Sequence, residues 1–222
     1  MTEREPLRHT PEQVADDARW DRWYGRWEPL DPAGLSAFMA GFPRPWWIVG
    51  GWSIDAFTGV PREHEDVDLS ILGCDIPHLR DHLGADWCLW SNASGTLRPL
   101  DERFPELLEP DCQVWIRRDA SSPWVVDLPV TPDRGGLWTS KRWADHAVPL
   151  EDATWVAADG IRYGNPEIAL HYKARSLREK DERDLDLCWP MLPADKQAWL
   201  LEAIRATEGP DHPWLSRLEG DG

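Results

Sequence analysis

The first two thirds of the chain alternate short apolar runs with stretches of helical periodicity. Apolar runs of strand length are PWWIVGG (45–51), DVDLSIL (66–72), DWCLWS (86–91), QVWIRR (113–118) and WVVDLPV (124–130). The stretch ATWVAADGIRYGN (153–165) predicts a hairpin with Asp159 and Gly160 at its turn. The pattern further predicts an irregular loop over 98–111 and helices over 11–24, 32–42, 52–59 and 76–84.

After Asn165 the pattern is helical, with helices expected over 166–177, 179–192 and 193–207. Strands and helices mix before this point, so the predicted fold class is α+β: a mixed β-sheet flanked by helices, with a helical C-terminal part packed on it. The expected organisation is an N-terminal helical segment (1–44), an α/β core (45–164) and a helical C-terminal region (165–222).

An acidic composition narrows the choice of partners. The 222 residues include 24 Lys and Arg and 40 Asp and Glu, giving a net charge of −16. Such a surface repels nucleic-acid phosphates and anionic membranes and attracts cationic small molecules. The four cysteines form no C-x-x-C pair, the N-terminus has no secretory signal, and no apolar run approaches the ~20 residues of a membrane span. We therefore expect a cytoplasmic protein that binds neither nucleic acid nor membrane.

A pair of carboxylates lies in the run DVDLSIL. In a strand, Asp66, Asp68 and Ser70 share one face, while the apolar residues between them share the other and can be buried. Two carboxylates on one face raise each other's pKa unless a cation lies between them. Hard oxygen ligands of this kind suit Mg²⁺, which usually shares its shell with substrate phosphates.

Two glycines precede the short helix that leads to these carboxylates. Gly50 and Gly51 permit close approach of the backbone to a phosphate, and Ser53 adds a hydroxyl near the helix start. Taken alone, a Gly-Gly corner often serves turn geometry, and a D-x-D pair can be a solvated face. The order strand, Gly-Gly, Ser, helix, D-x-D strand favours a site for a nucleoside triphosphate and its metal ions.

A third carboxylate, Asp127, interrupts the apolar run WVVDLPV. An acid within such a strand is costly unless it lies in a cleft or binds something. Its candidate roles are to complete a metal shell or to accept a proton from an attacking hydroxyl. The alternative is an edge-strand acid that faces solvent.

Residues 50–68 resemble the nucleotidyltransferase superfamily in its aminoglycoside and lincosamide adenylyltransferase branch. That branch shows Gly-Gly-Trp, then Ile/Val-Asp, an apolar helix and Arg-x-His-x-Asp-hydrophobic-Asp. The matching residues are Gly50, Gly51, Trp52, Ile54, Asp55, Arg62, His64, Asp66, Val67 and Asp68. A second stretch, ALHYKARSLREKDERDL (169–185), is similar to a Lys- and Asp-rich helical region of related proteins.

The resemblance implies transfer of a nucleoside monophosphate, usually AMP from ATP, to a hydroxyl of an acceptor, with release of pyrophosphate. The metal ligands that it implies, for two Mg²⁺ ions, are Asp66, Asp68 and Asp127, with Asp127 also the expected base. The nucleotide-binding residues that it implies are Gly50, Gly51, Ser53 and Lys173.

Several residues of the two matching stretches keep alternative interpretations. Arg62 and His64 either orient the carboxylates or hold the turn, and Lys173 is either a phosphate ligand or a surface lysine. Asp181 and Asp184 are expected to form local ion pairs, at helical spacing, with Arg178, Lys180 and Arg183.

The leading hypothesis is an adenylyltransferase that acts on a small hydroxylated acceptor, such as an aminoglycoside or lincosamide antibiotic. A polycationic acceptor suits the net charge of −16. One alternative is an enzyme that adenylylates a protein, as in toxin–antitoxin modules. Another is a nucleotide-binding module without transfer activity.

Overall fold

The computed structural model describes residues 11–219, so residues 1–10 of the expected N-terminal segment 1–44 lie outside the described part. Eight strands form one mixed sheet in the order β10-β11-β1-β2-β6-β5-β3-β4. Their bounds are β1 (Trp47–Val49), β2 (Asp68–Ser70), β3 (Cys88–Ala93), β4 (Thr96–Pro99), β5 (Gln113–Arg117), β6 (Val126–Pro129), β10 (Thr154–Val156) and β11 (Arg162–Gly164). Parallel pairs join β1 to β11 and β2 to β6, and the other pairs are antiparallel, which confirms the predicted mixed sheet.

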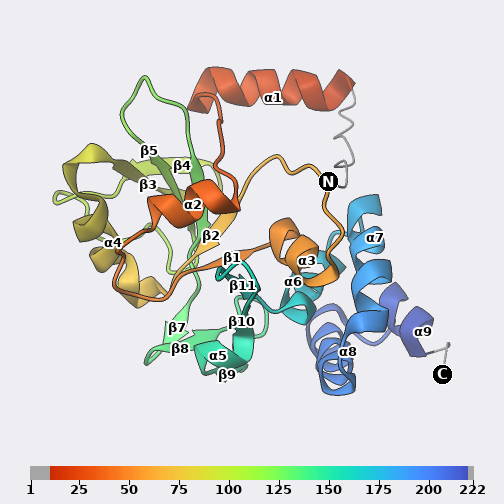
Figure 1. Ribbon diagram of the computed structural model, residues 1–222. Helices are drawn as coiled ribbons and strands as arrows, with labels where there is room; N and C mark the ends of the chain where they lie inside the picture. Colours follow the sequence, from red (N-terminus) through yellow and green to blue (C-terminus); the bar gives the residue numbers. More distant parts are fainter. Residues whose placement is uncertain (1–10, 220–222) are drawn as a thin grey trace.

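Helices surround this sheet and dominate the C-terminal part, as predicted (Figure 1). Before the hairpin they are α1 (Pro11–Tyr24), α2 (Pro32–Phe38), α3 (Gly51–Thr58) and α4 (Ile76–Leu83). After Val148 they are α5 (Leu150–Ala153), α6 (Pro166–Ala174), α7 (Glu179–Cys188), α8 (Ala194–Glu208) and α9 (Pro213–Glu219). Helices α7 to α9 gather on one side of the molecule, drawn in blue at the right of Figure 1. Within residues 11–219, no helix is both long and apolar enough to cross a membrane.

The alternation of side chains along the central strands gives the sheet two different faces. Ile48, Leu69 and Leu128, from three adjacent strands, are fully buried against Leu35 of α2 and Leu79 of α4. These five side chains belong to the main core, where removal of apolar surface from water stabilises the fold. The opposite face, one residue out of step, carries the polar residues of the candidate site.

Several predicted elements have different bounds in the structure. The helix expected over 32–42 ends at Phe38, and β4 extends into the loop expected over 98–111. The helix expected over 179–192 ends at Cys188 and continues as a 3₁₀ turn over Trp189–Met191, because Pro190 lacks the N–H needed to extend it.

A second, three-stranded sheet was not predicted. It consists of β7 (Asp133–Arg134), β8 (Leu137–Thr139) and β9 (Ala147–Val148). Trp138 of β8 is 4% exposed and packs with Trp47, Ala153 and Ile168 in a separate apolar cluster. This small sheet therefore lies against the polar face of the main sheet and helps to enclose a cavity.

Candidate active site

Three neighbouring central strands, β1, β2 and β6, bring the Gly-Gly corner and two of the predicted aspartates together on one face of the main sheet. Strand β1 ends at Val49, just before Gly50, and Val49 is paired with Asp68 of β2. Asp68 is in turn paired with Asp127 of the parallel strand β6. Paired residues of adjacent strands point to the same face, so the Gly-Gly corner and the two aspartates lie in one row.

This row borders a cavity of about 1120 Å³. A small-molecule site usually occupies about 300–1,000 Å³, so the cavity has room for a nucleotide and a second small molecule. Its walls come from β1, β2, α3, the loop before β2, the small sheet and helices α6 and α7. Six predicted site residues line it: Gly50, Gly51, Ser53, Asp66, Asp68 and Lys173. Ser70, which was predicted on the same strand face as the two aspartates, lines it too.

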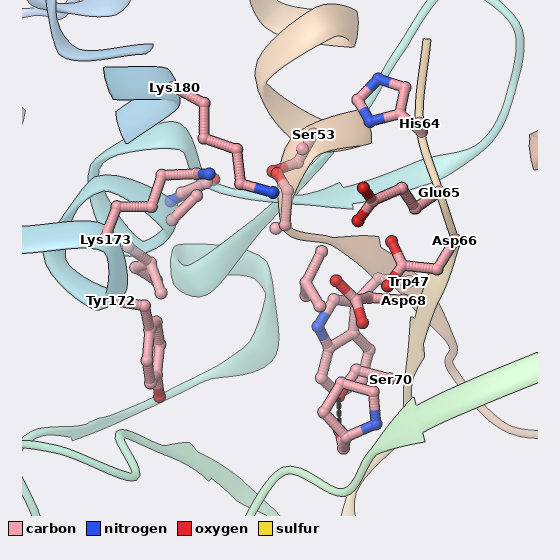
Figure 2. Close-up of a pocket in the computed structure, with 18 of the residues that line it drawn as sticks. Trp47, Ser53, His64, Glu65, Asp66, Asp68, Ser70, Tyr172, Lys173 and Lys180 are labelled. Carbon is pink, nitrogen blue, oxygen red and sulfur yellow. Dashed lines mark hydrogen bonds between the residues drawn. The ribbon is translucent and has the colours of Figure 1, made fainter. Parts of the chain in front are cut away.

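The carboxyl groups of Asp66 and Asp68 turn toward each other at the cavity wall (Figure 2). Burial and the nearby charge of Asp66 raise the pKa of Asp68 from 3.8 to about 7. Burial and the charge of Glu65 raise the pKa of Asp66 as well. A pair of carboxylates that is electrostatically strained without a counter-charge is suited to a cation.

Asp127 lies beside Asp68 but does not line the cavity. Its Oδ2 accepts a hydrogen bond of 2.8 Å from Gln113 Nε2, while its buried Oδ1 accepts none within residues 11–219. Burial, followed by the charges of Asp68 and Asp66, raises the pKa of Asp127 well above 3.8. The structure thus places the third carboxylate next to the pair but behind the wall, with one oxygen free to bind a proton or a cation.

The Gly-Gly corner packs tightly against the carboxylates and the loop that precedes them. Gly50 has φ +71° and ψ −141°, and a Cβ on it would lie 2.4 Å from Asp68 Oδ2. A Cβ on Gly51 would lie 2.8 Å from the His64 ring and 2.9 Å from Arg62 Nη2. Only glycines leave room for this arrangement. No side chain of the described residues caps the first turn of α3, so its backbone N–H groups are not occupied by a capping side chain.

Ser53 is buried near the start of α3 and lines the cavity. Its Oγ donates a hydrogen bond of 2.8 Å to the Gly50 carbonyl oxygen. In this arrangement the hydroxyl holds the Gly-Gly corner, and it has to rotate before it can donate to a ligand.

Lys173 of α6 reaches the cavity, but its ammonium group is already paired with carboxylates. Its Nζ lies 2.8 Å from Asp184 Oδ2 and 3.3 Å from Asp181 Oδ1. The predicted local pairing of these aspartates is correct for Asp181, which also binds Arg178 at 2.8 Å. It is wrong for Asp184, whose partners are Lys173 and Arg62, because α7 packs against α3 and α6 rather than standing free.

Arg62 and His64 both bind Asp55 of α3. Arg62 Nε lies 3.1 Å from Asp55 Oδ1, and His64 Nε2 lies 2.8 Å from Asp55 Oδ2. The His64 ring also stacks on Trp52, whose Nε1 donates to the Asp66 carbonyl oxygen at 2.8 Å. Both residues therefore hold the loop that carries Asp66.

Two further cations at the cavity wall were not predicted as site residues. Lys141, in the segment after β8, lines the cavity and lies close enough to Asp127 and Asp68 to interact with both charges. Lys180 of α7 points into the cavity in Figure 2. Nothing in the local sequence distinguished Lys141, because its place depends on a backbone hydrogen bond of 3.0 Å to the Tyr172 hydroxyl of a distant helix.

The donor set fits Mg²⁺ together with phosphate. Within the described part of the chain, no three His, Cys, Asp or Glu side chains converge into a ready-made metal cage. Asp66 and Asp68 supply two carboxylates, and the unpartnered Asp127 Oδ1 lies on the next strand. One or two carboxylates, completed by water and substrate phosphate, are the usual protein contribution to a Mg²⁺ site.

We expect the Mg²⁺ affinity of the protein to depend steeply on pH. The pKa of Asp68 is about 7, so below pH 7 a proton has to leave before the carboxylate can bind the ion. Affinity measured by calorimetric Mg²⁺ titration should fall about tenfold per pH unit below 7 and level off above 8. An affinity that is constant from pH 6 to 8 would contradict the raised pKa.

Comparison with known proteins locates a family match on this same region. The family model for aminoglycoside-2''-adenylyltransferase matches residues 35–92, which include the Gly-Gly corner and the D-x-D pair. The match confirms the resemblance to that nucleotidyltransferase branch. Among curated proteins, no sequence matches this chain significantly.

One solved structure is similar to most of the chain. It is the solution structure of the antibiotic-resistance factor ANT(2'')-Ia, with 17% sequence identity and a TM-score of 0.48. The alignment covers 85% of this chain and 94% of that one.

Proposed function

We propose that the chain is a Mg²⁺-dependent nucleotidyltransferase that moves AMP from ATP to a hydroxyl of a small acceptor of the aminoglycoside type. The observation that carries the proposal is the position of the Asp66–Asp68 pair. It faces a cavity of about 1120 Å³, beside the Gly-Gly corner and opposite the cations of α6 and α7. The family match over residues 35–92 supports the same activity.

The residues of the site would have different roles in such a transfer. Asp66 and Asp68 would hold Mg²⁺, with Asp127 Oδ1 beside them. When bound, Mg²⁺ neutralises charge on the triphosphate and makes the α-phosphorus more electrophilic. The N–H groups at the start of α3, and Lys173 and Lys180, suit binding of the triphosphate oxygens.

The acceptor hydroxyl oxygen attacks the α-phosphorus, the bond from this phosphorus to the bridging oxygen of pyrophosphate breaks, and the hydroxyl proton has to leave. Asp127 is our candidate to accept that proton, because its raised pKa makes it a stronger base than an exposed aspartate. Its carboxyl group lies behind the cavity wall, so its buried Oδ1 has to turn toward the cavity to reach the hydroxyl. Glu63, Glu65 and Glu179 also line the cavity, and their charges suit a cationic acceptor.

Pyrophosphate release tests the proposal. ATP, Mg²⁺ and a panel of aminoglycosides and lincosamides would be incubated with the protein, and the products weighed by mass spectrometry. The expected result is an acceptor that gains the mass of one AMP. Label on a co-purifying protein would instead support protein adenylylation, and ATP binding without release for any acceptor would support a nucleotide-binding module.

Replacing Asp127 with Asn separates the base from the metal ligands. We expect Asp127→Asn to lower kcat by about 10²–10⁴-fold, the usual contribution of a general base, while Mg²⁺·ATP still binds. Gln113→Leu, which removes the partner of Asp127 Oδ2 and the acceptor of a hydrogen bond from Asn92 but keeps the Asp127 carboxylate, serves as the matched variant and should reduce kcat far less. An unchanged kcat in Asp127→Asn would show that another group accepts the proton.

A further inference from the structure

Arg62 connects three separate parts of the chain next to the cavity. Its backbone N–H and its Nε donate to the two oxygens of Asp55 on α3, at 2.9 and 3.1 Å. Its Nη1 and Nη2 contact the two oxygens of Asp184 on α7, at 2.8 and 3.1 Å. The guanidinium is thus shared between two carboxylates that are 9% and 2% exposed.

The same Asp184 carboxylate also fixes Lys173. Lys173 Nζ lies 2.8 Å from Asp184 Oδ2, and the Lys173 side chain is only 11% exposed. The ammonium therefore cannot take another position without leaving a buried carboxylate short of a partner, which is costly. We call the connected set Asp55, Arg62, Asp184 and Lys173 the Arg62 clasp.

The clasp joins the two walls of the cavity. Arg62 lies four residues before Asp66 in one loop, and its Nη2 lies 2.9 Å from where a Gly51 Cβ would be. On the other side, Lys173 belongs to α6 and Asp184 to α7, in the helical C-terminal part. Movement of Arg62 would therefore shift the Asp66 loop relative to Lys173.

We infer that Arg62 is a positioning residue that sets the distance between Lys173 and the Asp66–Asp68 pair. The inference rests on the proposed function, in which the carboxylates hold Mg²⁺ and Lys173 binds the triphosphate of the same ligand. Arginine is required because its planar fork satisfies two carboxylates at once, whereas a lysine ammonium satisfies them only as a point charge.

Arg62→Lys tests this role while it keeps the charge. Binding of Mg²⁺ with a non-hydrolysable ATP analogue, measured by calorimetry, should weaken about tenfold, and kcat should fall up to about 10²-fold. The KM for the acceptor should change little. Arg26→Lys is the matched control, because Arg26 forms an exposed ion pair with Glu28 at 2.8 Å, and it should leave both quantities unchanged.

A double variant separates positioning from direct contact with the ligand. If Arg62 acts through Asp184, Arg62→Lys should add less than about threefold to the loss already caused by Asp184→Asn, because coupled residues are not additive. Equal losses in the two backgrounds would overturn the inference. A thermal unfolding curve of each variant confirms that the protein measured is folded.

The clasp and the proposed function fail in different ways. If Arg62→Lys binds Mg²⁺ with the ATP analogue as tightly as the wild-type protein does, only the inference about Arg62 is overturned. A wild-type protein that neither binds this complex nor releases pyrophosphate would overturn the proposed function, and the clasp inference with it.

Discussion

Replacing Asp68 with Asn should reduce nucleotidyl transfer about 10³-fold or more, because it removes one of the two carboxylates proposed to hold Mg²⁺. Asp68 is paired with Val49 before the Gly-Gly corner and with Asp127 on the next strand. An amide has nearly the same shape but cannot neutralise a divalent cation. The measurement is Mg²⁺-dependent pyrophosphate release, with Mg²⁺ titration of the same variant.

The same substitution should stabilise the metal-free protein at pH 8. The folded-state pKa of Asp68 is about 7 against 3.8 for an ordinary aspartate, so its favourable contribution is present at low pH and is lost as pH rises through 7. At pH 8 the folded protein carries a disfavoured charge that Asn lacks. We expect an increase in unfolding free energy of about 1–2 kcal/mol, a few degrees in thermal midpoint.

Asp81→Asn is the matched control for both effects, because Asp81 is an exposed carboxylate on α4, away from the cavity. It should leave transfer unchanged and alter stability by less than about 0.5 kcal/mol. Full transfer activity in Asp68→Asn would contradict the assignment of Asp68 to the active site. A loss of stability at pH 8 would instead show that the carboxylate pair is not strained without metal.

Local patterns predicted most of the elements that position the site. The strand at 66–72 was readable because three apolar residues alternate with polar ones, and Val67, Leu69 and Ile71 are indeed fully buried. The small sheet was not readable, since β7 and β9 have two residues each and form only when Trp138 packs against the main sheet. Strands this short depend on tertiary contacts rather than on periodicity.

Most predicted site residues lie along one wall of the cavity, with Lys173 on the opposite wall and Asp127 behind the first, but the sequence showed few of their contacts. The ion pair between Arg62 and Asp184 joins residues 122 positions apart, so no short-range sequence pattern could predict it. The engagement of Asp127 by Gln113 likewise follows from the pairing of β5 with β6. Sequence patterns identify which groups carry chemistry, whereas packing decides which of them are already bound to a protein partner.

Gly50→Ala should have the second large effect, because the glycine meets two constraints at once. Its backbone lies at φ +71° and ψ −141°, a region that essentially only glycine adopts, and the new Cβ would lie 2.4 Å from Asp68 Oδ2. We expect a loss of about 2–4 kcal/mol in unfolding free energy, from backbone strain and overpacking together. Mg²⁺ binding should weaken as well, since Asp68 has to move away.

Gly84→Ala isolates the backbone contribution. Gly84 follows α4 with nearly the same backbone angles, φ +58° and ψ −150°, and a Cβ there would meet nothing within 4 Å. It should therefore lose about 1–3 kcal/mol of stability with Mg²⁺ affinity intact. If Gly50→Ala also kept wild-type Mg²⁺ affinity, the close approach of the Gly-Gly corner to Asp68 would serve the turn alone. If Gly50→Ala lost Mg²⁺ affinity and Gly84→Ala kept it, the Gly-Gly corner and Asp68 would form one site. The reason is that Gly84→Ala introduces backbone strain without displacing a metal ligand.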